Sequence, residues 1–386
     1  MLRTIPTKTR QVRVPCKLNR FYSESSNAYI DKVNKARFDC SEQLKRADQS
    51  SVLLSKFYPE YLQDSYLAIK SFNIELSKVS FAHQPGATDR SKQFNNLKFS
   101  FWQEQIDKLD GLDMINAHER VLDMNEPVTM MLADNVLKGL NINTSMLRQM
   151  ISSHQYFYNN NASEGFKCLD DMCSFGEGTQ SQMNYLLQSV LLSPQLKGYS
   201  DSTIALLESS GTDNIRDNLS DISAHLGQST LLCSLMIALK YFAEKKQTLM
   251  LPTDTLTKHK LPEEDALRLL QGQNNNESKE LLKNVIFDVA TLANDHIITA
   301  RTKLKQVKEE IKEVASKSDD PLVNKLVSVK NGLPSCIYLP YMSGIPTILY
   351  LERLEKCDFD VLHPKLQFKE WRLALRAWWN ERNKSF

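Results

Sequence analysis

Residues 224–252 read AHLGQSTLLCSLMIALKYFAEKKQTLMLP, and this stretch decides the fold. Apolar side chains recur three and four positions apart along it, which is the spacing of one face of an α-helix. Its most apolar part, residues 231–239, is about half as long as a membrane-spanning helix must be, and Lys240 follows at once. The stretch therefore predicts a long helix buried in the core of a folded domain.

The same helical period continues on both sides of this stretch. It predicts helices over residues 29–55, 61–79, 99–109, 146–157, 178–192, 213–245, 262–271, 278–316, 345–357 and 366–379. Proline, glycine and polar residues predict connections at 83–95, 158–165, 254–262 and 317–345. Because the apolar pattern runs the whole length without a shift in composition, we expect an all-α protein with a single large helical domain.

The amino-acid composition argues against several other kinds of protein. Only 12 of the 386 residues are glycine, as expected for a helical chain. The net charge of +2, from 48 basic and 46 acidic residues, gives no electrostatic reason to expect a nucleic-acid partner. The seven cysteines are odd in number and irregularly spaced, which favours free thiols over disulfides or a structural metal.

The N-terminus has the composition of a mitochondrial targeting sequence. Residues 1–23 read MLRTIPTKTRQVRVPCKLNRFYS, with six basic residues, and the first acidic residue is Glu24. An Arg-rich, hydroxyl-containing segment without acids is typical of a transit peptide. We therefore expect a transit peptide at 1–22, a helical domain at 23–386 and a location in the mitochondrial matrix. The alternative is a basic arm that binds acidic surfaces.

Four stretches in order along the chain carry a family resemblance. They are YLAIKSFNIELSKV at 66–79, LKFSFW at 97–102, FGEGTQSQMNYLL at 175–187, and residues 224–252. Together they resemble the squalene/phytoene synthase superfamily, over roughly residues 28–380. The resemblance implies the all-helical isoprenoid synthase fold.

One branch of that superfamily fits better than the others. Five short sequences are similar to the mitochondrial complex I assembly factor 6 branch. They are FNIEL at 72–76, FW at 101–102, HLG at 225–227, LPTD at 251–254 and DFDVLHP at 358–364. This resemblance implies a matrix protein lying peripherally on the inner membrane. Its partners would be assembly intermediates of the complex I membrane arm.

The working synthases of the superfamily hold their diphosphate substrates through Mg²⁺ and two facing Asp-x-x-x-Asp motifs, since residues i and i+4 share a helix face. When the resemblance is threaded onto this chain, the four motif positions fall at Ser77, Phe81, Ala238 and Phe242. All four lack a carboxylate. Glu75 and Glu244 are two residues away, a rotation of about 200° along a helix, and are expected to face elsewhere. We therefore expect no catalytic residues, no metal and no cofactor.

Three functional hypotheses follow. The favoured one is a non-catalytic assembly factor, in which Phe72, Trp102 and Leu235 line the former substrate cavity. The second is a Mg²⁺-dependent prenyl-diphosphate transferase that uses other metal ligands. The third is a protein that binds a lipid or isoprenoid without turnover.

Other residue patterns have a structural explanation. Gly176 and Gly178 lie in a helical stretch and favour close helix packing over a phosphate-binding loop. His225 and His296 have no acid or cysteine at a spacing that would suggest a partner, so we expect hydrogen-bonded structural histidines.

Three tryptophans near the C-terminus are predicted to be core residues. They are Trp371, Trp378 and Trp379. Lys369, Arg372 and Arg376 lie among them, and such mixtures suit an anionic lipid surface, so an interfacial role stays open as the alternative.

Overall fold

The computed structural model describes residues 24–82, 88–112, 121–162 and 165–386, with the backbone alone for 24–27. Every regular element within these ranges is helical, which confirms the all-α prediction. The buried apolar side chains form one continuous core that runs from Val33 to Phe386. The transit peptide predicted at 1–22 lies outside the described residues.

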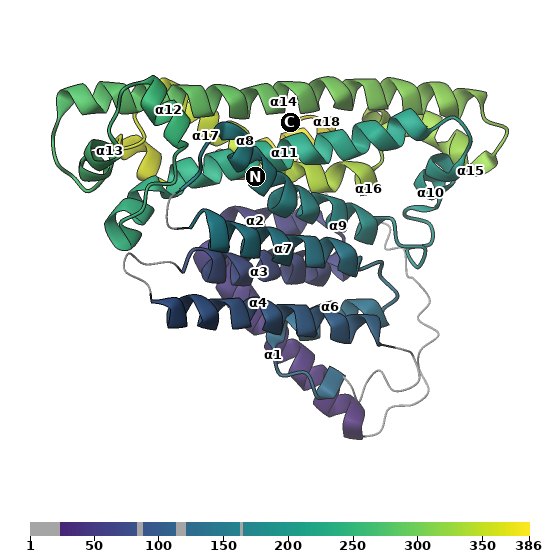
Figure 1. Ribbon diagram of the computed structural model, residues 1–386. Helices are drawn as coiled ribbons and strands as arrows, with labels where there is room; N and C mark the ends of the chain where they lie inside the picture. The colour runs from purple at the N-terminus through teal and green to yellow at the C-terminus, as the bar shows by residue number, and fades with distance from the viewer. Residues whose placement is uncertain (1–23, 83–87, 113–120, 163–164) are drawn as a thin grey trace, which may run out of the picture.

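The N-terminal half forms one layer of helices, the lower layer in Figure 1. Helix α3 lies at its centre and packs against α1, α6 and α7, while α4 packs against α7 and α6. The elements are α1 (Glu24–Ala47), α2 (Gln49–Leu54), α3 (Gln63–Ser80), α4 (Asp89–Asp110), α6 (Pro127–Leu137) and α7 (Thr144–Asn160), with short turns η1 (Ser55–Phe57) and η2 (Glu60–Leu62).

The C-terminal half forms a second layer around α11 and α14, which lie along the top of Figure 1. The longer helices are α8 (Leu169–Gly176), α9 (Gln182–Leu191), α10 (Asp201–Glu208), α11 (Asp213–Tyr241), α12 (Thr253–Lys258), α13 (Glu263–Leu270), α14 (Asn276–Lys317), α17 (Gly344–Lys356) and α18 (Leu373–Asn383). The shorter ones are η3 (Glu177–Ser181), η4 (Phe242–Lys246), α15 (Pro321–Asn324), η5 (Lys325–Ser328), η6 (Lys330–Gly332), α16 (Ser335–Tyr338), η7 (Leu339–Ser343) and η8 (Pro364–Gln367).

Helix α11 contains most of the stretch quoted first and is the central helix of the second layer. It packs against α14, α8, η3 and α17, and its Leu226, Leu232 and Met236 are no more than 2% exposed. With η4 it forms a continuous helix, Asp213–Lys246, which is long and apolar enough to cross a membrane by length and composition. However, 61% of its most apolar window is buried by neighbouring helices, as in the core helix of a folded domain.

Several boundaries differ from the sequence predictions. The predicted connection at 83–95 is wrong for its second half, because Thr88 caps α4, its hydroxyl accepting from the Ser91 amide, and the helix begins at Asp89. Helix α6 was not predicted. Its N-cap is Glu126, whose carboxylate accepts the Thr129 amide at 2.6 Å, and glutamate is not a usual capping residue. Helix α18 ends four residues later than predicted, at Asn383.

Three glycines allow neighbouring helices to approach closely, Gly176 and Gly227 between α11 and the α8–η3 segment, and Gly178 between η3 and α7 of the other layer. A Cβ atom on Gly227 of α11 would lie 2.3 Å from the Ser181 amide nitrogen, and one on Gly178 would lie 2.1 Å from the Ser153 hydroxyl. A Cβ on Gly176 would lie 2.9 Å from the Gln228 Cα. These contacts confirm the helix-packing interpretation of Gly176 and Gly178.

The Gly227→Ala substitution should destabilise the protein, because its methyl group would collide with backbone that cannot rotate away. Overpacking of this kind lowers the free energy of unfolding by about 1–3 kcal/mol. Urea denaturation followed by circular dichroism measures it. Ser234→Ala, at an exposed position of the same helix, is the control and should change stability by less than about 0.5 kcal/mol. An equal stability of the two variants would contradict the packing role of Gly227.

Candidate functional site

Five phenylalanine rings meet where the two layers join, and we call them the phenylalanine cluster: Phe81, Phe157, Phe166, Phe175 and Phe242. Phe81 follows the last residue of α3, and Phe242 follows the last residue of α11. Their ring centroids lie 5.1 Å apart. Phe157 and Phe175 are stacked at 4.7 Å with an interplanar angle of 21°, so the cluster is a packed hydrocarbon contact.

The segment after α11 fixes one side of the cluster. Phe166 forms an isolated parallel bridge with Pro252, and the Thr253 amide donates to the Phe166 carbonyl at 3.0 Å. Gly165 precedes it with φ +78°, and a Cβ there would lie 2.7 Å from the Leu249 carbonyl oxygen. The leucine-proline sequence noted after the long helix therefore holds Phe166 against the other rings.

The structure brings together two of the four threaded motif positions, Phe81 and Phe242. Ser77 and Ala238 lie one helical turn earlier on the same two helices, and both are half-buried. One further turn back, Asn73 and Ser234 occupy the equivalent positions. Each of these two helix faces thus presents uncharged side chains over three successive turns.

His154 of α7 lies beside the cluster and was not singled out from the sequence. Its Nδ1 is 2.9 Å from the Ser80 hydroxyl, and its Nε2 is 3.4 Å from the Asn73 Oδ1. Because the Asn73 oxygen can only accept, Nε2 carries the hydrogen and the Ser80 hydroxyl donates to Nδ1. Burial lowers the pKa of His154 to about 3, so the ring is a neutral, hydrogen-bonded part of the core.

The two nearby acids have partners elsewhere. The Glu75 carboxylate accepts from the Gln43 amide of α1 at 2.7 Å and pairs with Lys78 at 2.6 Å. Glu244 is exposed and lies 3.7 Å from Lys240. Over the part of the chain that the structure describes, no three His, Cys, Asp or Glu side chains are grouped so that they could hold a metal ion.

The residues predicted to line a cavity lie in the core. Phe72 and Trp102 meet edge to face at 5.4 Å and are 0% and 4% exposed. Leu235 is buried on α11. Trp102 also lines a groove of about 630 Å³ at the outer side of α1, α3 and α4.

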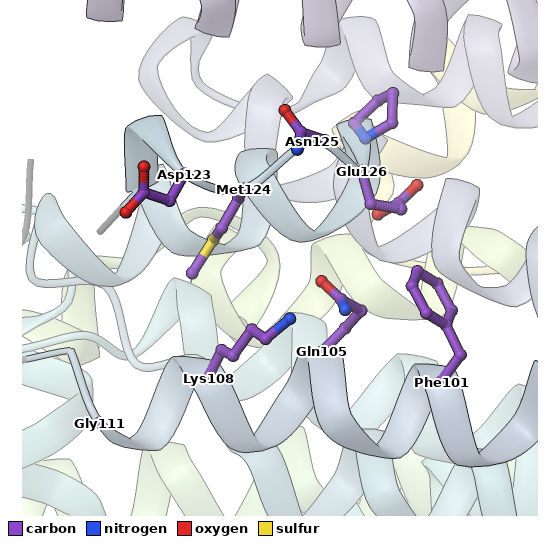
Figure 2. A pocket seen from close by; sticks show the side chains of 9 residues that line it. Phe101, Gln105, Lys108, Gly111, Asp123, Met124, Asn125 and Glu126 are labelled. Atoms are coloured by element: carbon purple, nitrogen blue, oxygen red, sulfur yellow. The ribbon is translucent and has the colours of Figure 1, made fainter. Parts of the chain in front are cut away.

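A larger cavity of about 800 Å³ adjoins that groove and is shown in Figure 2. Phe101, Gln105 and Lys108 of α4 project from one wall toward the segment that holds Met124 and Glu126. The lining mixes apolar, basic and acidic groups. Because Glu126 already caps α6, its carboxylate has a structural role in this wall.

A second group of polar side chains joins three helices of the C-terminal layer. The His225 and His296 Nδ1 atoms are 2.8 Å apart, and the His296 Nε2 is 3.5 Å from the Cys173 sulfur. The prediction that these histidines lack a cysteine partner was wrong, because Cys173 of α8 is far away in sequence. Burial lowers the pKa of His296 to about 4 and raises that of the Cys173 thiol to about 11. The group is therefore neutral at pH 7.

The core prediction for the three C-terminal tryptophans was also wrong. Trp371, Trp378 and Trp379 are 81%, 47% and 56% exposed. The six described cysteines, in contrast, are free thiols as predicted.

Comparison with known proteins places this arrangement in a family. The model of the squalene/phytoene synthase family matches residues 44–379, which is most of the chain. The chain belongs to the squalene/phytoene synthase family. A solved dehydrosqualene synthase in complex with a ligand shares this fold, with a TM-score of 0.52 and 12% identity over 90% of this chain and 96% of the other.

Several relatives of this chain are named as assembly factors and not as synthases. The chain is 24% identical over 347 residues to the Rattus norvegicus protein named NADH dehydrogenase (ubiquinone) complex I, assembly factor 6, covering 89% of this chain and 82% of that one. It is 22% identical over 337 residues to the Homo sapiens protein of that name, covering 87% and 79%. A Drosophila melanogaster homolog is 21% identical, covering 94% and 88%. The predicted resemblance to the squalene/phytoene synthases and to this branch is confirmed.

The Phe157→Ala substitution should destabilise the protein strongly, since Phe157 contacts three other rings of the cluster. Removing a buried phenylalanine costs about 3–5 kcal/mol, measurable by urea denaturation. The neighbouring Tyr156 is 68% exposed, and Tyr156→Ala should cost less than about 0.5 kcal/mol. A small effect at Phe157 would mean that the rings do not form a packed unit.

Stability should fall in acid because of His154. The folded state keeps its ring neutral, while the unfolded chain takes up a proton below about pH 6.5. The contribution of His154 to the free energy of unfolding should therefore be constant above about pH 7.5. Below about pH 6.5 it should fall by up to about 1.4 kcal/mol per pH unit from this group, until the pKa of about 3 is reached.

The His225 and His296 pKa values are lowered too and add to the fall in the same direction. Urea titrations at several pH values measure the slope. His154→Gln should reduce it without abolishing it. An unchanged slope in that variant would show that His154 is not held neutral by the fold.

Proposed function

We propose that the protein is a non-catalytic assembly factor of mitochondrial respiratory complex I. It would act on membrane-arm assembly intermediates, in the matrix and peripherally on the inner membrane. The observation that carries this proposal is the contact between Phe81 and Phe242, the rings at two positions where the synthases are expected to carry magnesium-binding carboxylates.

Hydrocarbon at these positions is incompatible with the charge of a bound diphosphate. A diphosphate bound through Mg²⁺ needs hard oxygen ligands and neutralisation of its leaving group. Hydrocarbon rings supply neither, and placing such charges among them incurs a large desolvation cost. If the first motif lies one helical turn earlier, it still meets no acid, because Asn73, Ser77 and Phe81 lie at successive i+4 positions and none of them is acidic.

Two independent features support the assembly role and the location. Curated relatives over most of the chain have the name of a complex I assembly factor. The basic, acid-free residues 1–22 have the composition of a transit peptide. The other two hypotheses require either bound metal or space for a prenyl chain between the two motif helices, where the five rings are packed.

Deletion of the protein from cells that have complex I tests the proposal. We expect membrane-arm intermediates, resolved by native gel electrophoresis and immunoblotting, to be depleted, because the factor that promotes their formation is missing. The wild-type chain should restore them, and so should Phe242→Leu, which keeps a hydrocarbon at the motif position. Normal levels of these intermediates in the deletion cells would refute the proposal.

A further inference from the structure

Helix α18 has two apolar faces, of which the fold covers one. Leu373, Ala377 and Asn380 are 6%, 0% and 5% exposed and face the protein. Positions 375, 378, 379 and 382 follow the i, i+3, i+4, i+7 spacing of the opposite face, and Trp371 lies in the turn just before the helix. Together with Phe368, the apolar residues at these positions form what we call the C-terminal aromatic surface: Phe368, Trp371, Leu375, Trp378 and Trp379.

The exposure of this surface is unusual for large apolar side chains. Phe368 and Leu375 are 72% and 65% exposed, in addition to the three tryptophans. Single exposed apolar residues need no explanation, but a contiguous group of them marks an interaction site.

The surface is held rigidly. Helix α18 packs against α17, η7 and α2. After the helix ends, the Tyr338 hydroxyl donates to the Ser385 carbonyl at 2.5 Å, and the Arg301 Nε donates to the Phe386 carbonyl at 2.7 Å. Because α18 packs on the fold and the residues after it are hydrogen-bonded, Trp378 and Trp379 are presented by a folded element.

The charges around the surface are mainly positive. Residues 365–386 contain six basic and two acidic side chains, a net charge of +4, and Glu352 of α17 pairs with Arg372 at 3.2 Å and with Arg376 at 2.8 Å. Both acids are held in ion pairs, Glu370 with Arg372 at 2.8 Å and Glu381 with Lys384 at 2.5 Å. Lys365, Lys369 and Arg382 are exposed, and the Arg382 guanidinium lies over the Trp378 ring at 5.5 Å.

We propose that the C-terminal aromatic surface is the site at which the protein binds an anionic lipid bilayer. This inference rests on the peripheral membrane location in the proposed function and assigns it to one surface. Tryptophan favours the boundary between headgroups and acyl chains, because its ring is apolar and its N–H is polar. Exposed bases beside such rings add attraction to anionic headgroups.

The geometry matches a helix that lies in the plane of the interface. Helices of that kind carry aromatic and aliphatic side chains along one face and basic residues at its borders. At 11 residues α18 is too short to span a bilayer. The surface should therefore insert only to the depth of its side chains.

Binding of the full chain to vesicles tests this inference, with tryptophan fluorescence as the probe. Three of the four tryptophans lie on the surface, while Trp102 is 4% exposed. With vesicles in which about a third of the phosphatidylcholine is replaced by phosphatidylglycerol, we expect co-sedimentation and a shift of the emission to shorter wavelength. Phosphatidylcholine alone should bind at least about tenfold more weakly, and salt should weaken binding to the anionic vesicles.

Substitutions test whether the C-terminal aromatic surface is the part of the protein that contacts the vesicle. The combined variant Trp371→Ser, Leu375→Ser, Trp379→Ser should bind anionic vesicles at least about tenfold more weakly. The matched control is Phe94→Ser, Leu97→Ser, which removes apolar side chains that are 60% and 65% exposed on α4, and should bind as the wild type does. Replacing the three surface tryptophans by phenylalanine should keep binding and abolish the emission shift.

Three results of the vesicle assay would overturn the inference: no binding, equal binding to both vesicle types, or equal loss in the serine and control variants. A wild-type dimer that the serine variant converts to a monomer would also overturn it, since a second copy would then cover the surface. The vesicle assay contains no complex I. A failure here would leave the assembly role standing, and normal complex I intermediates in deletion cells would leave vesicle binding untouched.

Discussion

The ring of Phe81 packs on the ring of Phe242 at a centroid distance of 5.1 Å, and this contact joins the two helical layers. Phe81 follows the last residue of α3 in the first layer, and Phe242 follows the last residue of α11 in the second. Phe157, Phe166 and Phe175 close around them, and the neutral His154 borders the group. A charged ligand could enter between Phe81 and Phe242 only if these two rings were separated.

The chain keeps helix-packing features of the fold, and the four positions onto which the motifs are threaded, Ser77, Phe81, Ala238 and Phe242, hold uncharged side chains. Gly176 and Gly227 allow backbone-to-backbone contact between α11 and its neighbours, and Gly178 allows η3 to approach Ser153 of α7. The segment after α11 still returns to pair with Phe166. Helix packing and chemistry are separable here, because packing depends on small residues and apolar faces, whereas metal binding depends on a few carboxylates. Membership of a synthase family therefore does not establish synthase activity for this chain.

Much of the fold could be predicted from the sequence, because α3, α11 and α14 have strong helical periods. Helix ends were less predictable, since a cap such as Glu126 carries no recognisable signal. For the site, Phe81 and Phe242 were named in advance, but their partners Phe157, Phe166 and Phe175 were not, as no spacing rule links five separate segments. The Cys173, His296 and His225 group was missed for the same reason. Trp371, Trp378 and Trp379 were misassigned to the core because periodicity identifies an apolar face without showing what covers it.

The most direct test of this account is an assay of inorganic pyrophosphate release. The purified full chain is incubated with Mg²⁺ and farnesyl or geranylgeranyl diphosphate, with a working squalene or phytoene synthase as the positive control. If hydrocarbon fills the places of the metal ligands, the release rate should equal that of a protein-free sample. Mg²⁺-dependent release above that rate would contradict the account and show that this chain carries out isoprenoid chemistry with ligands at other positions.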